Sequence, residues 1–533
     1  MSASPRLTAA LAAVLLAAGG CEPPSTRDTL VIAMSSDVSA LLPAVESGPD
    51  ASINSLLYLS LNSARWREGA IEYLIDERSL AEGWEFDSDS STLTYHLKPG
   101  ARWSDGEPID AGDVVFTYEL IRQPEVASRY GFFWEELDSV VALDERRVTF
   151  HFRRRHPLMM LHSGVGIMPE HVYRLVSANY DALARQPGVA GPGELVVSGP
   201  FRVIDRRPGE GFELRPNPLS VAGPPRLDHV VFRIIPDAAT RVIELENGGV
   251  DVIVPAPLEQ APRLARLPGL RVETTGYRYY EFIAWNGQQF DAFNDPVVRR
   301  ALSLAIDRES ILTGLSMDGF AAPAAGPSSP LFPQLVDPSL RPDPYRPDSA
   351  ATLLAGAGWR DSDGDKVLDR DGTPFRITLL TQSDNELRRS IAEVVQAQLG
   401  AIGVQIDVRA MERNAAIDLV FNRHDFQAAL FGWSVTLEPS YLIDQFWPPD
   451  KPYNITGYSS AALDSLVPAA LAAADPQEAA RYWRAVGVEI ARDRPYAFLW
   501  FYSEAVALND RVTGYYIDSY NVYQNLHQWT VQR

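Results

Sequence analysis

Cysteine is almost absent from this sequence: Cys21 is the only one in 533 residues. A single thiol cannot form an intramolecular disulfide, so the folded state must be stabilised by its hydrophobic core. The composition can supply a large core, because 46% of the residues are hydrophobic and 10% are aromatic. At roughly 150 residues per domain, a chain of this length suggests about three domains.

Basic residues are also scarce, with 48 Lys and Arg against 69 Asp and Glu, for a net charge of −21. Nucleic-acid binding needs clustered positive charge to neutralise phosphates, so this balance argues against nucleic acid as a partner. Solubility is the simplest explanation of the acidity.

Long hydrophobic runs are missing except at the N-terminus, where the 14 residues from Leu7 to Gly20 are almost wholly apolar. A membrane-spanning helix needs roughly 20 apolar residues, so this run is too short to span and has the length of a signal-peptide core. No second run approaches membrane length, and we expect the mature protein to be soluble apart from any attached lipid.

The end of that run, Ala18-Gly19-Gly20-Cys21, resembles a bacterial lipobox, whose cysteine carries a diacylglycerol after cleavage. We therefore predict a signal peptide over 1–20, a lipid on Cys21, a short tether over 21–27, and a location in the periplasm or at the cell surface. An ordinary secretory signal is the alternative.

Catalytic motifs are missing as well. The sequence contains no nucleophile elbow, HExxH, Walker loop or GxGxxG. His151, His156 and His162 are spaced so that they share neither a strand face nor a helix face, which argues against a metal site. We expect no enzyme activity and no cofactor.

One metal-like pattern is present, because Asp361, Asp363, Asp365 and Asp369 lie close together in one loop. Carboxylates at alternate positions of a tight loop can converge on Ca²⁺. Lys366 stands where an EF-hand loop has glycine, however, so a solvated acidic turn is favoured over a structural calcium site.

The most informative stretch runs from Leu97 to Phe116, with a strand-like segment from Thr92 to His96 leading into it. Leu93, Tyr95 and Leu97 alternate with polar residues, which predicts a strand with one buried face. Asp110, followed three residues later by Asp113, predicts a helix start with a reciprocal cap.

This stretch closely resembles a signature of the extracytoplasmic solute-binding proteins of family 5, the peptide and nickel binding class of ABC importers. Met168-Pro169-Glu170-His171 and the helix predicted over 294–311, capped by Asp295 with Pro296 at its first position, resemble further family motifs in the same order. The resemblance covers essentially the whole mature chain from about Leu30.

The fold that the resemblance implies is α/β, a bilobed type II periplasmic-binding fold with an extra N-terminal subdomain and a hinge of two chain crossings near Gly276 and Tyr502. It implies a discontinuous first lobe, an inserted subdomain and a distal lobe. The boundaries that we predict are 28–57, 187–275 and 503–533 for the first lobe, 58–186 for the inserted subdomain and 276–502 for the distal lobe.

The resemblance also implies a ligand site around Trp433. Peptide-binding members place an Asp three residues after this Trp to pair with the ligand's amine, and here that position is Thr436, with Glu438 as a substitute acid. A buried core role for Trp433 is the alternative. The predicted ligand-contacting residues are Tyr280, Asn286, Gly432, Trp433, Thr436, Glu438 and Tyr458.

The function implied is capture of an oligopeptide between two lobes and its delivery to a membrane permease, by a monomer anchored only through its lipid. Because Thr436 replaces the Asp of the peptide-binding members, a second hypothesis is that the ligand is another solute of the family's range, such as a sugar, a nickel chelate or an amino-acid conjugate. A periplasmic hydrolase or chaperone-like protein on the same scaffold is a third hypothesis.

Overall fold

The computed structural model describes residues 29–46, 48–88, 91–156, 158–174, 195–435, 439, 441–473 and 475–532. The predicted signal peptide, Cys21 and the tether lie outside these residues. Within the described ranges, none of the helices combines the length and the apolar character that a membrane crossing requires.

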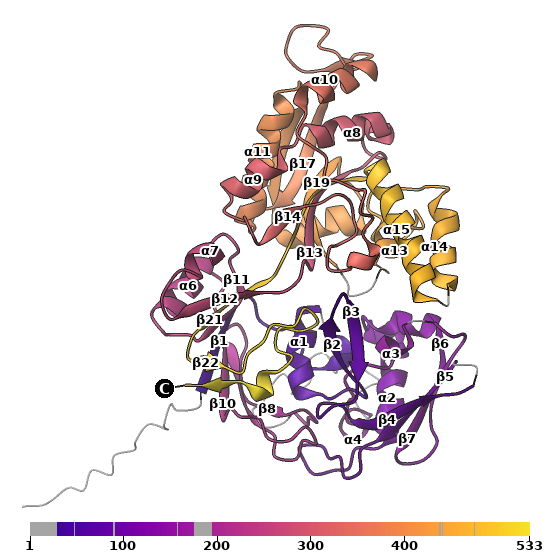
Figure 1. Ribbon diagram of the computed structural model, residues 1–533, viewed down its shortest axis with the longest axis vertical. Helices are drawn as coiled ribbons and strands as arrows, with labels where there is room; N and C mark the ends of the chain where they lie inside the picture. The colour runs from indigo at the N-terminus through magenta and orange to yellow at the C-terminus, as the bar shows by residue number, and fades with distance from the viewer. Residues whose placement is uncertain are drawn as a thin grey trace, which may run out of the picture.

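A seven-stranded sheet forms one side of the lower half of the molecule in Figure 1. Strand β1 pairs in parallel with β10 and β11, and the other neighbours are antiparallel. Its strands come from three separate stretches, each within the range predicted for the discontinuous first lobe. In sheet order they are β12 (Leu270–Thr274), β21 (Ala505–Asn509), β11 (Val252–Ala256), β1 (Thr29–Met34), β10 (His229–Ile234), β9 (Gly211–Pro216) and β8 (Phe201–Arg207).

The region inserted after the first helix contains a four-stranded antiparallel sheet and a separate hairpin. The sheet order is β4 (Ala81–Phe86), β5 (Thr92–Leu97), β7 (Arg147–Phe152) and β6 (Leu137–Ala142), and the hairpin is β2 (Ser63–Arg67) and β3 (Ala70–Leu74). The helices of this half are α1 (Gly48–Leu57), α2 (Ala111–Arg122), α3 (Met159–His162), α4 (Glu170–Tyr173), α6 (Ala238–Glu246) and α7 (Ala261–Leu264), with η2 (Pro43–Val45), η3 (Pro124–Val126) and η4 (Gly131–Glu135).

The stretch from Leu93 to Phe116 has the structure that its pattern predicts. Leu93, Tyr95 and Leu97 are buried on one face of β5. The Asp110 side chain caps the start of α2. The Asp113 carboxylate in turn accepts a hydrogen bond from the Asp110 backbone amide, which confirms the predicted reciprocal cap. Asp113 also accepts a hydrogen bond of 3.1 Å from the Trp103 indole. Its burial raises the pKa of the carboxyl to about 6.

One hydrophobic core runs without a break through the first lobe and the inserted region. Leu30 and Ile32 of β1 belong to the same buried cluster as Leu93 and Tyr95 of β5. The inserted region therefore packs as part of the first lobe.

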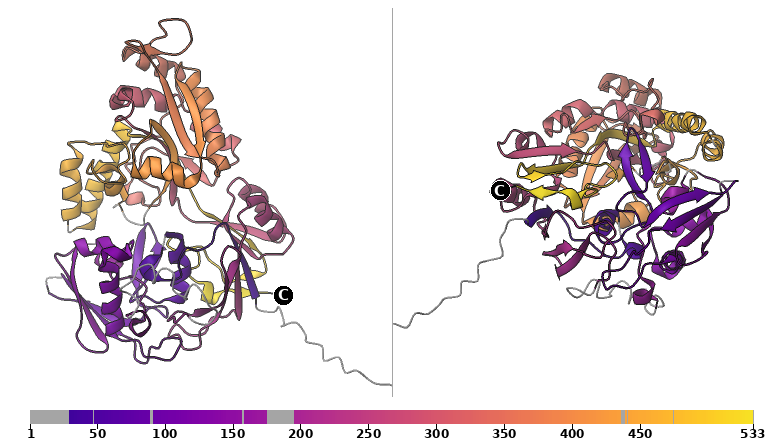
Figure 2. Two further views of the ribbon diagram at one scale, coloured as in Figure 1. Left: turned by 180° about the vertical axis from the view of Figure 1, so that it is seen from behind. Right: turned by 60° about the horizontal axis from the view of Figure 1, so that its bottom comes forward.

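The other half of the molecule, the distal lobe, is built on a six-stranded sheet (Figures 1 and 2). Its strands in order are β14 (Ala321–Pro323), β20 (Tyr496–Tyr502), β13 (Tyr279–Trp285), β19 (Ala428–Ser434), β17 (Arg376–Gln382) and β18 (Gln405–Met411). Its helices are α8 (Pro296–Leu304), α9 (Arg308–Gly314), α10 (Pro347–Gly356), α11 (Glu386–Gly400), α12 (Arg413–Ile417), the π-helix η8 (Asp418–Asn422), α13 (Tyr441–Phe446), α14 (Leu463–Ala472) and α15 (Pro476–Asp493), with η6 (Asp291–Asn294) and η7 (Pro333–Leu335).

The distal sheet is buried on both faces. Along β13, Tyr280 and Phe282 enter one core cluster, whereas Ile283 and Trp285 enter the cluster on the opposite face. Helix α8 begins as predicted, with Asp295 as its cap and Pro296 at its first position. The prediction of one helix over 294–311 is wrong, because α8 ends at Leu304 and Asp307 caps a second helix, α9.

The proline-rich span over 321–347 packs onto the distal lobe. Leu331, Phe332 and Leu335 are buried within it. Short strands complete the fold: β15 (Asp369–Arg370) with β16 (Thr373–Pro374), and β22 (Val512–Thr513) with β23 (Thr530–Val531), the latter next to η9 (Leu526–Gln528).

Candidate ligand-binding site between the two lobes

Two adjacent chain crossings join the lobes. The first runs from β12 to β13 and the second from β20 to β21. The Thr275 amide donates to the Glu504 carbonyl at 2.9 Å, and the Glu504 amide donates to the Thr275 hydroxyl at 2.9 Å. A Cβ on Gly276 would clash with Leu331 Cδ1, so an alanine here would require the Leu331 side chain to shift. The predicted two-crossing hinge is thus present.

Aromatic side chains line the hinge. Tyr279 and Tyr502, one at each crossing, stack with ring centroids 5.3 Å apart. The Tyr279 hydroxyl donates to the Glu504 carboxylate at 3.1 Å. Burial raises the pKa of Glu504, and nearby Arg278 and the Tyr279 hydroxyl oppose that rise.

The lobes also touch through the β2–β3 hairpin, which points toward the distal lobe in both side views (Figures 1 and 2). The Trp66 ring meets Phe332 edge-on at 5.2 Å. The Gln334 amide donates to the Gly69 carbonyl at 3.0 Å. The side of the lobe interface next to the hinge is therefore packed.

Trp433 stands near the end of β19, opposite Tyr280 in the neighbouring strand. It is half-buried and packs against the rings of Phe282, Phe421 and Tyr453. Because β13 leaves the hinge beside this end of β19, the structure places Trp433 close to the lobe junction, as a ligand-contacting role requires. Such contact stays a prediction.

Three other predicted ligand residues lie inside the distal lobe, which corrects their assignment. Tyr280 is fully buried and its hydroxyl donates to the Gln445 side chain. Asn286 is fully buried and its amide donates to the His424 carbonyl at 3.0 Å. The Tyr458 hydroxyl donates to Asp493 at 2.8 Å. Their polar groups are occupied by internal partners, so they do not present these groups to a ligand.

Gly432 also has a structural reason to be glycine. A Cβ there would lie 2.5 Å from Arg388 Nη2 and 2.7 Å from Glu281 Oε1. Arg388 and Glu281 form a buried two-bond ion pair, with 2.9 Å for each bond. The Tyr502 hydroxyl donates to the same carboxylate at 3.2 Å. Although burial alone would lower the pKa of Arg388, the Glu281 charge and hydrogen bonds raise it overall.

The remaining two predicted residues, Thr436 and Glu438, lie outside the described residues. The strand that leads to them is described up to Val435, whose amide donates to the Arg278 carbonyl at 2.6 Å. Their roles stay predictions.

A buried acid that the sequence did not reveal lies in the first lobe. Glu46 follows η2 and accepts hydrogen bonds from the Tyr130 hydroxyl and from the Asn54 amide, the latter at 2.7 Å. Burial raises the pKa of Glu46 to about 7, and these two donors oppose the rise. Tyr130 is 84 positions away in the sequence, so no local pattern could have predicted the contact.

The acidic loop places three of its four predicted ligands together. Oxygen atoms of Asp361, Asp363 and Asp365 lie within 4.8 Å of one another at the surface. Asp369 instead accepts bonds from the Ser362 amide and hydroxyl, so the prediction that it belongs to the set is wrong. Each of the three also accepts a backbone amide of the loop, as a solvated turn does.

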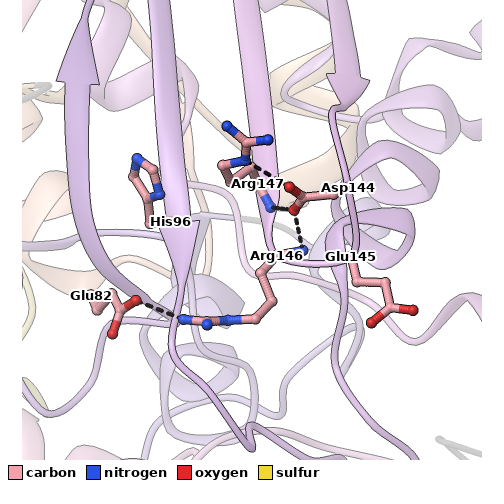
Figure 3. Close-up of a pocket in the computed structure, with 6 residues that line it drawn as sticks. All are labelled: Glu82, His96, Asp144, Glu145, Arg146 and Arg147. Carbon is pink, nitrogen blue, oxygen red and sulfur yellow. Dashed lines mark hydrogen bonds and ion pairs between the residues drawn. The ribbon is translucent and has the colours of Figure 1, made fainter.

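A hollow of about 580 Å³ lies on the four-stranded sheet (Figure 3). Arg146 contacts Glu82 at 2.6 Å, and Arg147 contacts Asp144 at 2.7 Å, so both arginines of the hollow are paired with acids that also line it. The hollow belongs to the inserted region. None of the residues that line it comes from the hinge or from β19. Its lining residues are Glu82, His96, Asp144, Glu145, Arg146 and Arg147.

The decisive comparison is with protein families. The family described as bacterial extracellular solute-binding proteins, family 5 Middle, matches residues 77–454, which is most of the chain. The chain belongs to this family. Family 5 membership implies a binding protein that acts outside the cytoplasm.

Relatives and solved structures agree with this assignment. The oligopeptide-binding protein AppA of Bacillus subtilis is 29% identical over 499 residues, covering 92% of this chain and 89% of AppA. The glutathione-binding protein GsiB of Salmonella paratyphi A is 26% identical, covering 82% of this chain and 83% of GsiB. The structure of Bacillus subtilis AppA with a nonapeptide has a TM-score of 0.79 at 27% identity, over 95% of this chain and 99% of that one.

More distant structures share the bilobed α/β fold alone. Brucella suis NikA with Fe(III)-EDTA has a TM-score of 0.81 at 18% identity, over 95% of this chain and all of that one. The same family 5 fold therefore holds ligands of different chemistry, and the ligand must be argued from the site.

Proposed function

We propose that this protein is the substrate-binding component of an ABC importer and captures oligopeptides between its two lobes. The observation that carries the proposal is the placement of Trp433. This half-buried ring stands on a strand that ends at the lobe junction, in a family 5 chain whose relative AppA is named for oligopeptide binding.

The mechanism is lobe closure. A ligand that contacts both lobes binds the closed form better than the open form and shifts the population toward it. The crossings at Thr275 and Glu504 would absorb the backbone change, because hinges concentrate such change in a few residues. The contacts of the β2–β3 hairpin with Phe332 and Gln334 would have to change as the lobes move. A membrane permease then recognises the closed protein.

An extended peptide suits a site at the end of β19, the strand that leads into 436–438. Main-chain groups of such a ligand would be read by backbone hydrogen bonds, and its side chains would occupy roomy, water-filled pockets, which gives broad specificity. The neutral hydroxyl of Thr436 would accept a hydrogen bond from the ligand's amine. Glu438 would supply the negative charge that Thr436 lacks.

We propose that the protein lies at the outer face of a membrane and that a lipid on Cys21 anchors it there. We also propose that the folded part is a monomer. The apolar run that ends at Cys21 supports this arrangement. Mass spectrometry of the mature N-terminal peptide tests the lipid: a diacylglyceryl mass on Cys21 is expected, and a free thiol would point to the ordinary secretory signal.

Native mass spectrometry of protein purified without refolding tests the ligand. A ladder of co-purified peptide masses is expected. A single discrete mass would favour another solute, such as a sugar, a metal chelate or an amino-acid conjugate, and Thr436 is the feature that would explain it. Complete absence of bound ligand, with turnover of a substrate, would favour the hydrolase hypothesis.

Thermal shift with mixed di- to pentapeptides is the second test, with Trp433→Ala as the site variant. The peptides should raise the melting temperature of the unaltered protein, and Trp433→Ala should abolish the shift while the protein remains folded. An unchanged shift would remove Trp433 from the pocket.

A further inference from the structure

A series of aromatic rings runs from the interior of the distal lobe to its surface at Trp433. Tyr496 and Phe282, both fully buried, stack at 4.3 Å. Phe282 lies nearly parallel to Trp433 at 6.3 Å, and Trp433 meets Tyr453 edge-on at 5.5 Å. Tyr453 is 50% exposed, so the series ends in an aromatic ring at the surface.

Besides Phe282 and Tyr453, a third ring packs against Trp433 and fixes its orientation. Phe421 meets Trp433 at 4.9 Å and an angle of 68°. Phe421 belongs to the π-helix η8, a form of helix that is rare and is found often at functional sites. We call Phe421, Trp433 and Tyr453 the aromatic corner.

The loop that carries Tyr453 is held firmly on both sides of the exposed ring. Asn454 is fully buried, its amide donates to the Tyr458 carbonyl at 2.8 Å, and it accepts from the Tyr458 amide at 3.0 Å. The Pro452 carbonyl lies 2.9 Å from His424 Nε2, just after η8. An exposed aromatic ring on a fixed loop loses little conformational entropy when a ligand covers it.

Arg423, two residues after Phe421, is paired with acids of its own segment. It contacts Asp425 at 2.9 Å and Asp418 at 4.0 Å. The rings of the aromatic corner themselves present mainly apolar surface with weakly polar edges. Such a surface favours an apolar or aromatic side chain over a charged one.

We propose that Tyr453 is a specificity-determining residue that, with Trp433, binds an apolar or aromatic side chain of the captured peptide. This inference rests on the proposed peptide function and adds which side-chain class the pocket prefers. The alternative is that Tyr453 only shields Trp433 from water.

The test uses pentapeptides with an alanine backbone in which Phe or Ser is placed at each position in turn. Calorimetric affinities are measured for the full chain, for Tyr453→Ala, for Tyr453→Phe, and for Tyr345→Ala, which removes an exposed tyrosine elsewhere in the distal lobe. The unaltered protein should prefer Phe over Ser at one position by roughly tenfold, the scale of an aromatic contact.

Tyr453→Ala should lose that preference at that position alone, whereas Tyr453→Phe and Tyr345→Ala should keep it. A preference that survives in Tyr453→Ala overturns this inference and leaves the peptide function intact. Failure of the unaltered protein to bind any of the pentapeptides overturns the peptide function and the inference together.

Discussion

Two buried carboxylates, one in each lobe, are stabilised in opposite ways. Glu46 in the first lobe receives hydrogen bonds from a hydroxyl and an amide, both neutral, and burial raises its pKa to about 7. Glu281 in the distal lobe receives both arms of the Arg388 guanidinium. Burial places the pKa of Glu46 near neutral pH, because its hydrogen-bond donors are neutral and only partly oppose the loss of hydration. Glu281 is instead held in a bidentate ion pair with Arg388.

The strongest way to break the distal pair is Arg388→Ala. It leaves the Glu281 charge buried without its partner, and the free energy of unfolding should fall by roughly 3–5 kcal/mol. Urea unfolding measures the loss, and Arg409→Ala, at an exposed arginine of β18, is the control and should change little. The double variant Glu281→Gln with Arg388→Met should recover most of the stability, because no charge is then stranded. A single variant as stable as the parent would contradict the buried-pair account.

Glu46→Gln sharpens the comparison from the other lobe. Because the folded pKa of Glu46 is raised from 4.5 to about 7, its contribution to stability is present below pH 4.5 and is lost as the pH rises through about 7. The variant has no such titration, so its stability relative to the parent should rise across that window by roughly 3 kcal/mol.

Urea unfolding at several pH values across the window measures this difference. Glu309→Gln, at an exposed acid of α9, is the matched control and should follow the parent at every pH. Parallel curves for Glu46→Gln and the parent would show that Glu46 does not titrate there.

Gly432→Ala probes the space around the ion pair without removing a charge. The new methyl would press on Arg388 Nη2 and Glu281 Oε1, so a loss of roughly 1–3 kcal/mol is expected. Gly356→Ala is the control, because a Cβ there meets nothing within 4 Å. Equal melting temperatures for Gly432→Ala and the parent would mean that the pair can move aside.

The carboxylates of the acidic loop are exposed to solvent, unlike Glu46 and Glu281. We expect the smallest change in stability for this loop. Addition of calcium at about 1 mM, where extracellular calcium modules bind, should leave the melting temperature as it is in EDTA. A calcium-dependent rise that Asp363→Asn removes would establish a metal site at Asp361, Asp363 and Asp365.

The parts of the fold that the sequence predicts well are those determined by neighbouring residues. The reciprocal cap of Asp110 and Asp113 and the alternating strand from Leu93 to Leu97 are patterns within a few positions, and both are confirmed. The cap at Asp295 succeeds for the same reason.

The site is harder to predict, because its contacts join residues that are far apart in sequence. Glu281 and Arg388 are separated by 107 positions. The assignment of Tyr280 to the ligand fails because β13 is buried on both faces, and a strand of that kind carries no alternation to show which side chains face a pocket. Asp369 fails because its nearest donor is the Ser362 side chain, which a count of carboxylates ignores.

The unbroken core shared by β1 and β5 determines whether the inserted region can be removed from the chain. A module that had joined a complete lobe would keep its own interior and could be cut away again. Here Leu30 and Tyr95 share one interior, so removing the inserted region would lay bare apolar surface of the lobe beneath it. Despite its length, the protein should therefore melt as two cooperative units: the first lobe with the inserted region, and the distal lobe.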